Sequence, residues 1–339
     1  MTAAVLTGID RPLQVRDVPY PTLVDGSVVV RVRAAGVCHT DLHLCEGVPA
    51  DPPLPLVLGH EIAGEVAEVG ANVSGRRVGD RVLVYYYDGC GTCEWCAVGD
   101  EQLCATPRAK WGFDTDGGFA EYIAVPARCV VALPDGCSFA EAATLGCAGT
   151  TAVHVAHDVA AVAHGEVVVV VGAGGVGLAC VQVAKAAGAR VIAVDPAAAS
   201  RTAAQDCGAA AVVDPGQDDP VRVVAELTGG RGSDVVVDTV GDDRTPGQCV
   251  AMARRRGRVV LVGYDRMPAP LDLMSVIGRE VRVLGSVGAT LANARTAVEL
   301  VARGQLRGWI DTEMELSAAP DALARLRGAG VVGRIVLVP

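Results

Sequence analysis

The sequence predicts an α/β protein with a β-rich domain followed by a doubly wound parallel sheet, and three observations lead to this class. Short strands between Gly and Pro turns fill the first 148 residues. From about residue 165, apolar strands alternate with helices. The tail returns to mixed helix and strand. We therefore expect three segments, with the last rejoining the first domain: 1–148, 149–288 and 289–339.

The strands of the first domain are predicted from alternating apolar and polar residues bounded by turn residues. They are "SVVVRVRAAG", "GEVAEVG", "GDRVLVYYY" and "AEYIAVP". The second domain opens with "EVVVVVG", a continuous apolar run typical of a strand buried on both faces. "VGLACVQVAKAAG" follows with helical spacing and a Gly stop.

Further βα alternation predicts the rest of the parallel sheet. The expected strands are "ARVIAVD", "AAVVD", "SDVVVDTVG", "GRVVLVG" and "VRVLGSV". The expected helices run through "RTAAQDCG" and near 219–228 and 244–254. In the tail, "GQLRGWIDTEMEL" to "GRIVLVP" is expected to rejoin the first domain.

Charge and composition exclude several classes of function. The formal net charge is −10, and the only basic run is Arg254–Arg256, which we expect to be a solvated helix end. Nucleic acid is therefore not an expected partner. The N-terminus lacks the pattern of a signal peptide, and glycines interrupt the most apolar window, so no membrane span is expected. We expect a cytoplasmic protein.

Four of the twelve cysteines lie together in "CGTCEWCAVGDEQLC". Cys90, Cys93, Cys96 and Cys104 are separated by gaps of two, two and seven residues. Tetrahedral zinc needs four ligands, with sulfur at about 2.3 Å, and a tight loop supplies them at little entropic cost. A disulfide pair and an iron–sulfur cluster are the alternatives. Four cysteines leave no open coordination position, so we expect the loop 90–104 to hold a structural zinc.

The segment "GAGGVG" follows an apolar strand and opens a helix, as in a Rossmann dinucleotide-binding site. Its glycines let the backbone and the helix N-terminus approach a pyrophosphate. Asp195 ends the next strand and is expected to accept hydrogen bonds from a ribose diol, or else to be an ordinary turn residue. The loop residues expected at the cofactor are Gly172, Gly174, Gly175, Val176 and Gly177.

The segment "GVCHTDLH" places a thiol, imidazoles, a hydroxyl and a carboxylate at the end of a predicted strand. Cys38 alone is usually a buried packing residue. With His60 and Cys147 it would form a Cys₂His set open to water, as in catalytic zinc sites. From spacing alone this set is weak, because residues so far apart carry no local geometry.

The chain resembles the zinc-dependent alcohol dehydrogenases of the medium-chain dehydrogenase/reductase superfamily. The motifs "AGVCHTDLH", "GHEIAGEV", "VGDRV", "CGTCEWC", "GGFAEY", "GAGGVG" and "GRIVLVP" occur in family order over nearly the whole chain. The resemblance implies a GroES-like catalytic domain and a Rossmann NAD-binding domain. It also implies two zinc ions per subunit and a homodimer or homotetramer.

Residue roles implied by the resemblance begin with the catalytic zinc. Its ligands would be Cys38, His60 and Cys147. Glu61 would lie beside the metal as an occasional fourth ligand. Asp41 would orient His60 and fix its tautomer.

The other implied roles concern substrate, proton and cofactor. Thr40 would hydrogen-bond the substrate oxygen, and His43 would pass its proton to solvent. His39 and Arg334 would sit near the cofactor pyrophosphate, and Thr151 would touch the nicotinamide. Tyr86 falls near the family's aromatic substrate-pocket position.

The function that the resemblance implies is reversible hydride transfer between an alcohol and NAD, which gives an aldehyde or ketone. A zinc-free quinone or enoyl reductase would lack Cys38 and Cys147. A zinc-dependent polyol dehydrogenase, or a reductase of carbonyls or conjugated carbonyls, would look nearly identical. A non-catalytic cofactor-binding protein would have no need of the thiols, His60 and the Thr40/His43 pair together. The remaining cysteines are expected to be buried packing residues: Cys45, Cys129, Cys137, Cys180, Cys207 and Cys249.

Overall fold

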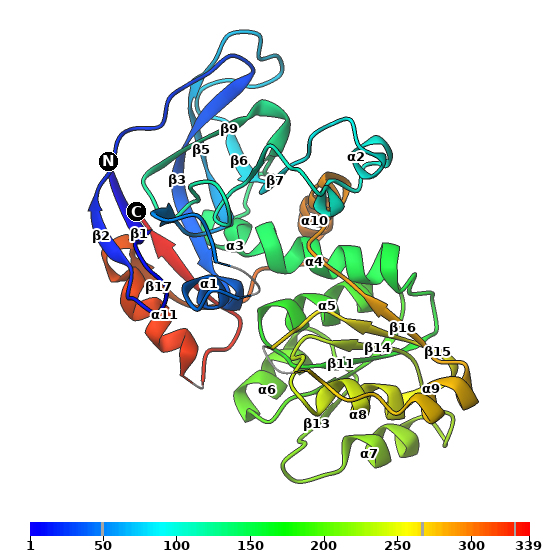
Figure 1. Ribbon diagram of the computed structural model, residues 1–339. Helices are drawn as coiled ribbons and strands as arrows, with labels where there is room; N and C mark the ends of the chain where they lie inside the picture. The colour runs from blue at the N-terminus through cyan, green and yellow to red at the C-terminus, as the bar shows by residue number, and fades with distance from the viewer. Residues whose placement is uncertain (49–50, 266–267, 329) are drawn as a thin grey trace. The chain divides into compact units, whose positions relative to one another are not determined.

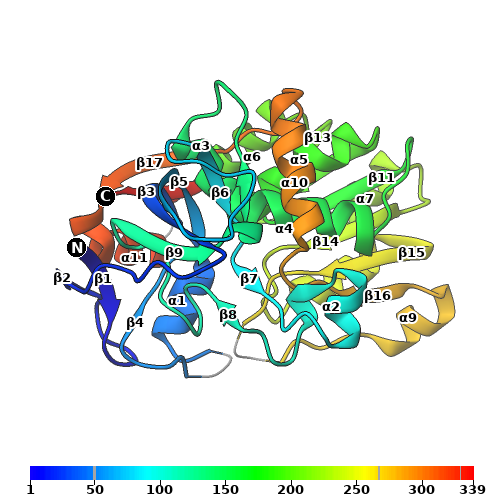
Figure 2. The same ribbon diagram turned by 90° about the horizontal axis from the view of Figure 1, so that it is seen from above.

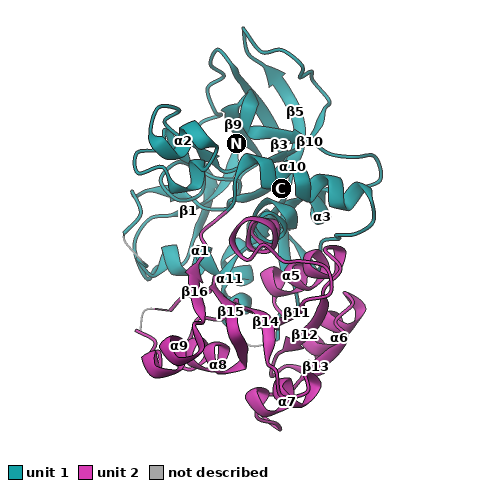
Figure 3. Ribbon diagram, turned by 90° about the vertical axis from the view of Figure 1, so that its right-hand side faces the viewer, with its two compact units in different colours: residues 1–150, 289–339 teal, residues 151–288 magenta. Residues whose placement is uncertain are grey.

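The structure, a computed structural model, describes residues 1–48, 51–265, 268–328 and 330–339. The chain divides into two compact units (Figure 3). Unit 1 comprises 1–150 and 289–339, and unit 2 comprises 151–288. The C-terminal segment thus belongs to the same unit as the N-terminal segment.

Unit 1 is built mainly on antiparallel strands, of which β3, β5, β6, β9 and β17 can be seen in Figure 2. Its larger sheet has the order β10-β6-β5-β3-β18-β17 with β9 paired to β3, and β17 is parallel to β18. These strands are β3 (Ser27–Val37), β5 (Glu61–Val69), β6 (Arg81–Val84), β9 (Tyr122–Pro126), β10 (Val130–Ala132), β17 (Ile310–Glu315) and β18 (Arg334–Val338). A smaller sheet contains β1 (Thr2–Leu6), β2 (Gln14–Asp17) and β4 (Leu56–Val57), and a ribbon pairs β7 (Tyr87–Asp88) with β8 (Ala109–Lys110). Buried and exposed residues alternate in the middle of β3, as expected of a strand with one solvated face.

The helical segments of unit 1 are short. They are α1 (His39–Cys45), α2 (Glu94–Val98), η1 (Glu101–Leu103), η2 (Ala127–Cys129), α3 (Phe139–Thr144), η3 (Leu145–Gly149), α10 (Leu291–Ala302), η5 (Leu316–Ala318) and α11 (Ala319–Arg327). Helix α4 (Thr150–Val153) crosses the unit boundary. Helices α3 and α10 begin with capping boxes, Ser138 with Glu141 and Thr290 with Asn293, so side chains satisfy their first amide groups.

Unit 2 is a parallel sheet of order β13-β12-β11-β14-β15-β16 (Figure 1). Its strands are β11 (Val167–Val171), β12 (Arg190–Val194), β13 (Ala211–Val213), β14 (Ser233–Asp238), β15 (Ala253–Leu261) and β16 (Arg282–Gly285). The intervening helical segments are η4 (His154–Val159), α5 (Gly175–Ala186), α6 (Ala198–Asp206), α7 (Pro220–Leu227), α8 (Thr245–Met252) and α9 (Leu273–Arg279). Every residue of β11 and β14 is buried, as expected where helices cover both faces.

The expectation that Arg254–Arg256 is a solvated helix end was wrong about the helix, although Arg255 and Arg256 are exposed. These residues form the start of β15 and are not a helix end, because α8 stops at Met252. Arg254 bonds the buried Asp234, and Arg256 pairs with Glu280. Arg254 and Arg256 are thus each paired with an acidic side chain from another segment of unit 2. The six cysteines outside the two clusters are buried, which confirms that expectation.

Candidate metal centres and cofactor site

The turn from β3 into α1 fixes Cys38 and Asp41. Cys38 is the N-cap of α1, and its amide donates to Asp41 Oδ2 at 2.8 Å. The other carboxylate oxygen, Oδ1, lies 3.3 Å from Nδ1 of His60. Both Asp41 and His60 are completely buried. Asp41 therefore holds the end of the strand and the imidazole in one arrangement.

The Nε2 atom of His60 has no hydrogen-bond partner among the described residues, although the side chain is buried. Ligand atoms of Cys38, His60, Glu61 and Cys147 all lie within 4.8 Å of one another. A buried imidazole nitrogen without a partner is costly unless something binds it. Two sulfurs, one imidazole and a carboxylate form a donor set that suits zinc. The residues therefore fit a metal ion at this place.

Cys147 reaches the group from a widened helical turn. It lies in η3, a π-helical segment, and such segments are frequent at functional sites. The hydroxyl of Thr150 donates to the carbonyl oxygens of Gly146 and Cys147, so a side chain supplies hydrogen bonds to backbone acceptors of this wider turn. A Cβ on Gly146 would lie 3.1 Å from Cα of Glu61, so a side chain there would crowd the approach of η3 to β5.

Arg334 on β18 points into the same group. Its Nε donates to both oxygens of Glu61, at 3.0 and 3.1 Å, and an Nη donates to Cys38 Sγ at 3.3 Å. Burial raises the pKa of Glu61 to about 7, although Arg334 opposes the shift. A Cβ on Gly36 would lie 2.0 Å from Glu61 Oε2, so any other residue at position 36 would clash with the carboxylate.

The two thiols of the group are unequal. A hydrogen bond from Cys147 lowers the pKa of Cys38, and Arg334 and His60 lower it further, against the effect of burial. The same hydrogen bond, together with burial, raises the pKa of Cys147. Arg334 and His60 thus stabilise a thiolate in this pair, and the thiolate is the form that binds metal.

Helix α1 carries the other chemical groups of "CHTDLH". Thr40 Oγ1 lies 3.6 Å from Cys38 Sγ, so its hydroxyl is next to the metal ligands. His39 is exposed, and His43 is half-buried in the last turn of the helix. The structure therefore brings Thr40 to the cluster and leaves His39 facing outwards.

Aromatic rings border His60. The ring of Tyr86 is centred 5.1 Å from the imidazole, and that of Phe113 lies 4.9 Å away. Tyr86 and Phe113 stack at 5.5 Å. Sequence reasoning found Tyr86 but missed Phe113. At the neighbouring Gly112 a Cβ would be 2.7 Å from the Gly59 carbonyl oxygen, so the loop packs tightly against the backbone before His60.

The four cysteines of residues 90–104 also converge, with sulfur atoms within 4.8 Å of one another. Backbone amides point at the sulfurs: Cys93 N–H donates to Cys90 Sγ at 3.3 Å, and Cys96 N–H donates to Cys93 Sγ at 3.5 Å. Such donors favour thiolate, and the pKa of Cys90 is lowered to about 5, chiefly by the amide of Thr92. These residues fit a tetrahedral zinc.

The Gly-rich turn of unit 2 connects β11 to α5. Gly172 has a φ of +86°, and a Cβ there would be 2.6 Å from Thr239 Oγ1. A Cβ on Gly177 would be 1.8 Å from the Gly172 carbonyl oxygen. At Gly174, the N-cap of α5, a Cβ would meet nothing within 4 Å. That open space beside a helix N-terminus fits a phosphate group.

Asp195 stands after β12 beside this turn. Its Oδ2 accepts from the Ala173 amide at 2.7 Å, and Oδ1 accepts from the Ala197 amide at 2.8 Å. Arg201 is held by an ion pair with Asp214 at 2.9 Å and by the Asp195 carbonyl. Thr151 is buried in α4.

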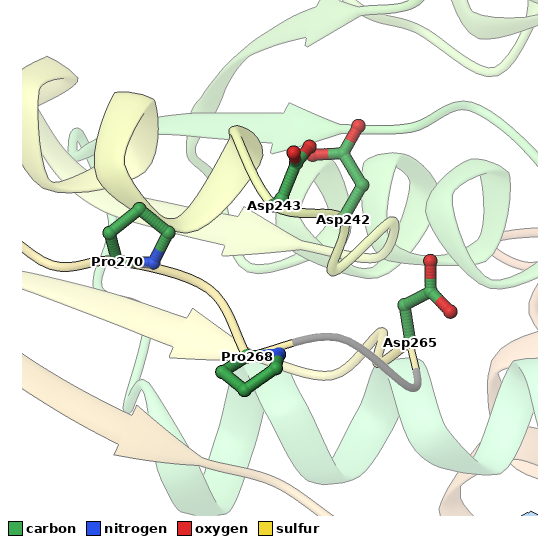
Figure 4. A pocket seen from close by; sticks show the side chains of 5 residues that line it. All are labelled: Asp242, Asp243, Asp265, Pro268 and Pro270. Carbon is green, nitrogen blue, oxygen red and sulfur yellow. The ribbon is translucent and has the colours of Figure 1, made fainter.

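An acidic hollow of unit 2 has a different character. Figure 4 shows the acidic and proline side chains that line a pocket, and the volume of this pocket is about 460 Å³. Its lining residues are Asp242, Asp243, Asp265, Pro268 and Pro270. Asp242 Oδ1 is engaged by the amides of Arg244 and Thr245 at 2.9 and 2.8 Å. The Asp242 carboxylate thus stabilises the turn before α8 by accepting from its backbone amides.

Comparisons with known proteins match most of the chain. The alcohol dehydrogenase GroES-like domain matches residues 24–135, and the zinc-binding dehydrogenase domain matches 175–303. The chain is 38% identical over 339 residues to an alcohol dehydrogenase of Geobacillus stearothermophilus, with 99% of each chain covered. It belongs to the zinc-binding alcohol dehydrogenase family.

Other members of the family are similar over their full length. The NAD-dependent alcohol dehydrogenase of Sulfurisphaera tokodaii is 34% identical over 350 residues, with 100% of both chains covered. The solved alcohol dehydrogenase of Aeropyrum pernix is 37% identical with a TM-score of 0.93, and the match covers 100% of both chains. The expected combination of a GroES-like domain with a Rossmann-like parallel sheet is confirmed.

Within this family, the chain has two candidate zinc sites. One is the cysteine group 90–104, and the other is the group around His60. No helix in the described ranges is long and apolar enough to cross a membrane.

Proposed function

We propose that this protein is an NAD-dependent oxidoreductase that reversibly converts an alcohol to an aldehyde or ketone. The observation that carries the proposal is the convergence of Cys38, His60 and Cys147 around a buried nitrogen that has no partner among the described side chains. The full-length relatives that are named alcohol dehydrogenase support it.

The catalytic zinc would be held by Cys38, His60 and Cys147, with Glu61 as an occasional fourth ligand. When bound, the metal supplies a Lewis acid that makes an alcohol hydroxyl more acidic. Asp41 holds His60 through Nδ1 and so presents Nε2 to the metal. The Thr40 hydroxyl, beside Cys38 Sγ, donates to and accepts from the substrate oxygen. His43 carries the released proton towards solvent.

NAD is the proposed cofactor, and when bound it accepts the hydride. Gly172, Gly174, Gly175, Val176 and Gly177 would hold its pyrophosphate at the N-terminus of α5. Asp195 would accept from the ribose diol and repel a 2′-phosphate. His39 and Arg334 would approach the pyrophosphate, and Thr151 the nicotinamide. For Arg334 this requires the guanidinium to share its donors between Glu61 and the phosphate, which five N–H groups permit.

The second zinc would be structural, because Cys90, Cys93, Cys96 and Cys104 fill a tetrahedral shell. Tyr86 would line the substrate pocket from beside His60. A cytoplasmic location agrees with twelve cysteines that are all free of disulfides.

We also assign a homo-oligomer, and α9 with β16 supports it. Leu273, Met274 and Ile277 expose 65%, 77% and 69% of their surface on α9. Strand β16 is the last strand on its side of the sheet. An exposed apolar helix beside a sheet edge is a typical contact between copies of one chain. Light scattering of Ile277→Lys tests this, since a mass equal to the unmutated protein's would contradict it.

A panel of primary, secondary, cyclic and aromatic alcohols, and their carbonyls, followed by NADH absorbance, tests the activity. Because one relative, 35% identical over 96% of this chain, is named L-threonine 3-dehydrogenase, a hydroxylated amino acid belongs in the panel. Turnover of no alcohol by protein that carries two zinc ions would contradict the proposal and favour a non-catalytic role.

A further inference from the structure

Lys110 occupies a position beside the aromatic rings that border His60. It lies in β8 directly opposite Tyr87 of β7, so the two side chains share a face of the ribbon. Its Nζ is 5.1 Å from the centre of the Tyr87 ring and 3.8 Å from the centre of the Phe113 ring. The lysine is therefore positioned by the ribbon and by two ring faces.

The same ring connects Lys110 to the candidate catalytic group. The centre of the Phe113 ring lies 4.9 Å from the centre of the His60 ring and 3.8 Å from Nζ of Lys110. The Phe113 ring therefore lies in contact with both the imidazole and the ammonium group. Burial lowers the pKa of Lys110, while Asp114 and Cys147 raise it.

The ammonium has no counter-ion among the residues that the structure describes. No carboxylate lies within ion-pair distance of Nζ, and Nζ makes no hydrogen bond there. The neighbouring Asp114 uses Oδ1 to accept from the Lys110 backbone amide at 2.6 Å and from the Thr115 hydroxyl at 2.9 Å. Ring faces attract a cation but accept none of its three N–H groups as a carboxylate does.

A half-buried ammonium that keeps three donors available beside a reaction centre is suited to bind an anion. The other groups of the proposed site have other roles: Cys38, His60 and Cys147 would hold the metal that binds the hydroxyl, and Thr40 and His43 would handle the proton. The aromatic rings between His60 and Lys110 provide an apolar surface for a carbon chain. Together these groups match a molecule with a hydroxyl at one end and an anionic group at the other.

We propose that Lys110 is a specificity residue that binds a carboxylate carried by the substrate, so that the preferred substrates are hydroxy acids and the corresponding oxo acids. This inference rests on the proposed dehydrogenase function. The carboxylate is unchanged in the reaction, in which the carbinol carbon loses hydride to NAD and the hydroxyl loses a proton. Lys110 contributes binding energy and orientation only.

Steady-state kinetics of the zinc-loaded enzyme provides the first test. The substrates are ω-hydroxy acids of increasing chain length and the neutral primary alcohols of the same length. Lys110→Met should lower kcat/KM for the best hydroxy acid by about tenfold to a hundredfold, as loss of a charged hydrogen bond does. The neutral alcohol should change by less than about threefold. Lys110→Arg should keep most of the preference, because the charge remains.

Three results would contradict the proposal, and each would identify a different part of it as wrong. If no alcohol of either series is oxidised, the dehydrogenase function itself fails. If neutral alcohols are oxidised and the ratio of the two series is the same in Lys110→Met, only the carboxylate proposal is overturned. If Lys110→Met raises the KM for NAD equally with both series, the anion is a cofactor phosphate, which also overturns it. Lys185→Met, which removes the same charge at the exposed lysine of α5, is the matched control and should leave the ratio unchanged within about threefold.

Direct observation of the lysine provides a second test. The chain has only two lysines, Lys110 and Lys185, against twenty-seven arginines. Reductive ¹³C-methylation keeps the charge and gives a resolved NMR signal for each, assigned with Lys110→Arg and Lys185→Arg. Addition of an ω-hydroxy acid should shift the Lys110 signal and leave that of Lys185 in place. A Lys110 signal that does not respond at saturating hydroxy acid would contradict binding at this residue.

Discussion

Arg334 and Glu61, 273 positions apart in the chain, form a buried ion pair in which Nε donates to both carboxylate oxygens. Arg334 is 4% exposed and Glu61 is completely buried. The same guanidinium donates to Cys38 Sγ. The pair therefore connects the last strand of the chain to the candidate catalytic group, and each partner neutralises a charge that burial makes costly.

Removal of one partner should destabilise the protein more than removal of both. Arg334→Met leaves the Glu61 carboxylate unpaired, and we expect a loss of about 3–5 kcal/mol in the free energy of unfolding. Arg334→Met with Glu61→Leu should recover a large part of it. Urea unfolding of the zinc-loaded protein measures both. A single variant that loses less than about 1 kcal/mol would show that the pair carries little of the stability.

Two groups of cysteines should hold two zinc ions with separate roles. Cys38→Ser or His60→Ala should lose one zinc per subunit and abolish turnover, while the protein stays folded. Cys93→Ser should lose the other zinc and lower the thermal midpoint before it affects chemistry, because that ion organises a loop. Elemental analysis with circular dichroism measures both. Cys180→Ala, at a buried cysteine outside both groups, is the control and should keep two zinc ions. Fully active enzyme with one zinc or none would contradict the assignment.

Asp195 should set the preference for NAD over NADP. Asp195→Asn keeps an oxygen that can accept from the Ala173 amide and removes the charge that repels a 2′-phosphate. We expect the ratio of kcat/KM for NAD to that for NADP to fall about tenfold. We expect Arg201 not to rescue NADP binding in the unmutated protein, because Asp214 pairs with it at 2.9 Å. Equal use of the two cofactors by the unmutated enzyme would contradict the role of Asp195.

Acid stability should depend on Asp234 in unit 2. Burial raises its pKa, but Arg231, the Val167 amide and Arg254 outweigh burial and hold the pKa below its usual range. A carboxyl whose pKa is lower in the folded state adds stability that is present above the unfolded-state pKa, about 3.9, and is lost as the pH falls towards the folded value. Asp234→Asn should therefore cost about 2 kcal/mol at neutral pH, and this difference should shrink below about pH 4. Denaturant unfolding across pH measures it.

The control for this prediction is Asp218→Asn. Asp218 makes an ion pair with Arg222 at the surface, where 49% of its side chain is exposed. Such a pair is worth little, so its removal should change stability by less than about 1 kcal/mol at any pH. A pH-independent cost for Asp234→Asn would show that shape, not charge, explains its effect.

The fold and one metal group could be predicted from the sequence because their signals are local. The valines of β11, the Gly-rich turn and the cysteines of 90–104 carry their geometry within a few residues. Cys38, His60 and Cys147 are far apart in the sequence, and their convergence depends on how β3, β5 and η3 pack. Only the family resemblance suggested this group. Phe113 and Lys110 were missed because the pairing of β7 with β8 has no sequence pattern of its own. The run Arg254–Arg256 was misassigned because its partners, Asp234 and Glu280, lie 20 and 24 residues away in the chain.

The proton path should run through Thr40. Hydride transfer leaves one proton to lose, and the Thr40 hydroxyl, 3.6 Å from Cys38 Sγ, can donate and accept at once. Positioned proton transfer contributes about 10²–10⁴-fold, so Thr40→Ala should lose activity on that scale with both zinc ions retained. Thr40→Ser keeps a hydroxyl and should retain most of the rate. His43→Gln, in the half-buried last turn of α1, should lose less than Thr40→Ala because water can replace the imidazole. Its lost rate should be partly restored by small amine buffers. A Thr40→Ala enzyme with an unchanged rate of alcohol oxidation would show that the proton leaves by another route.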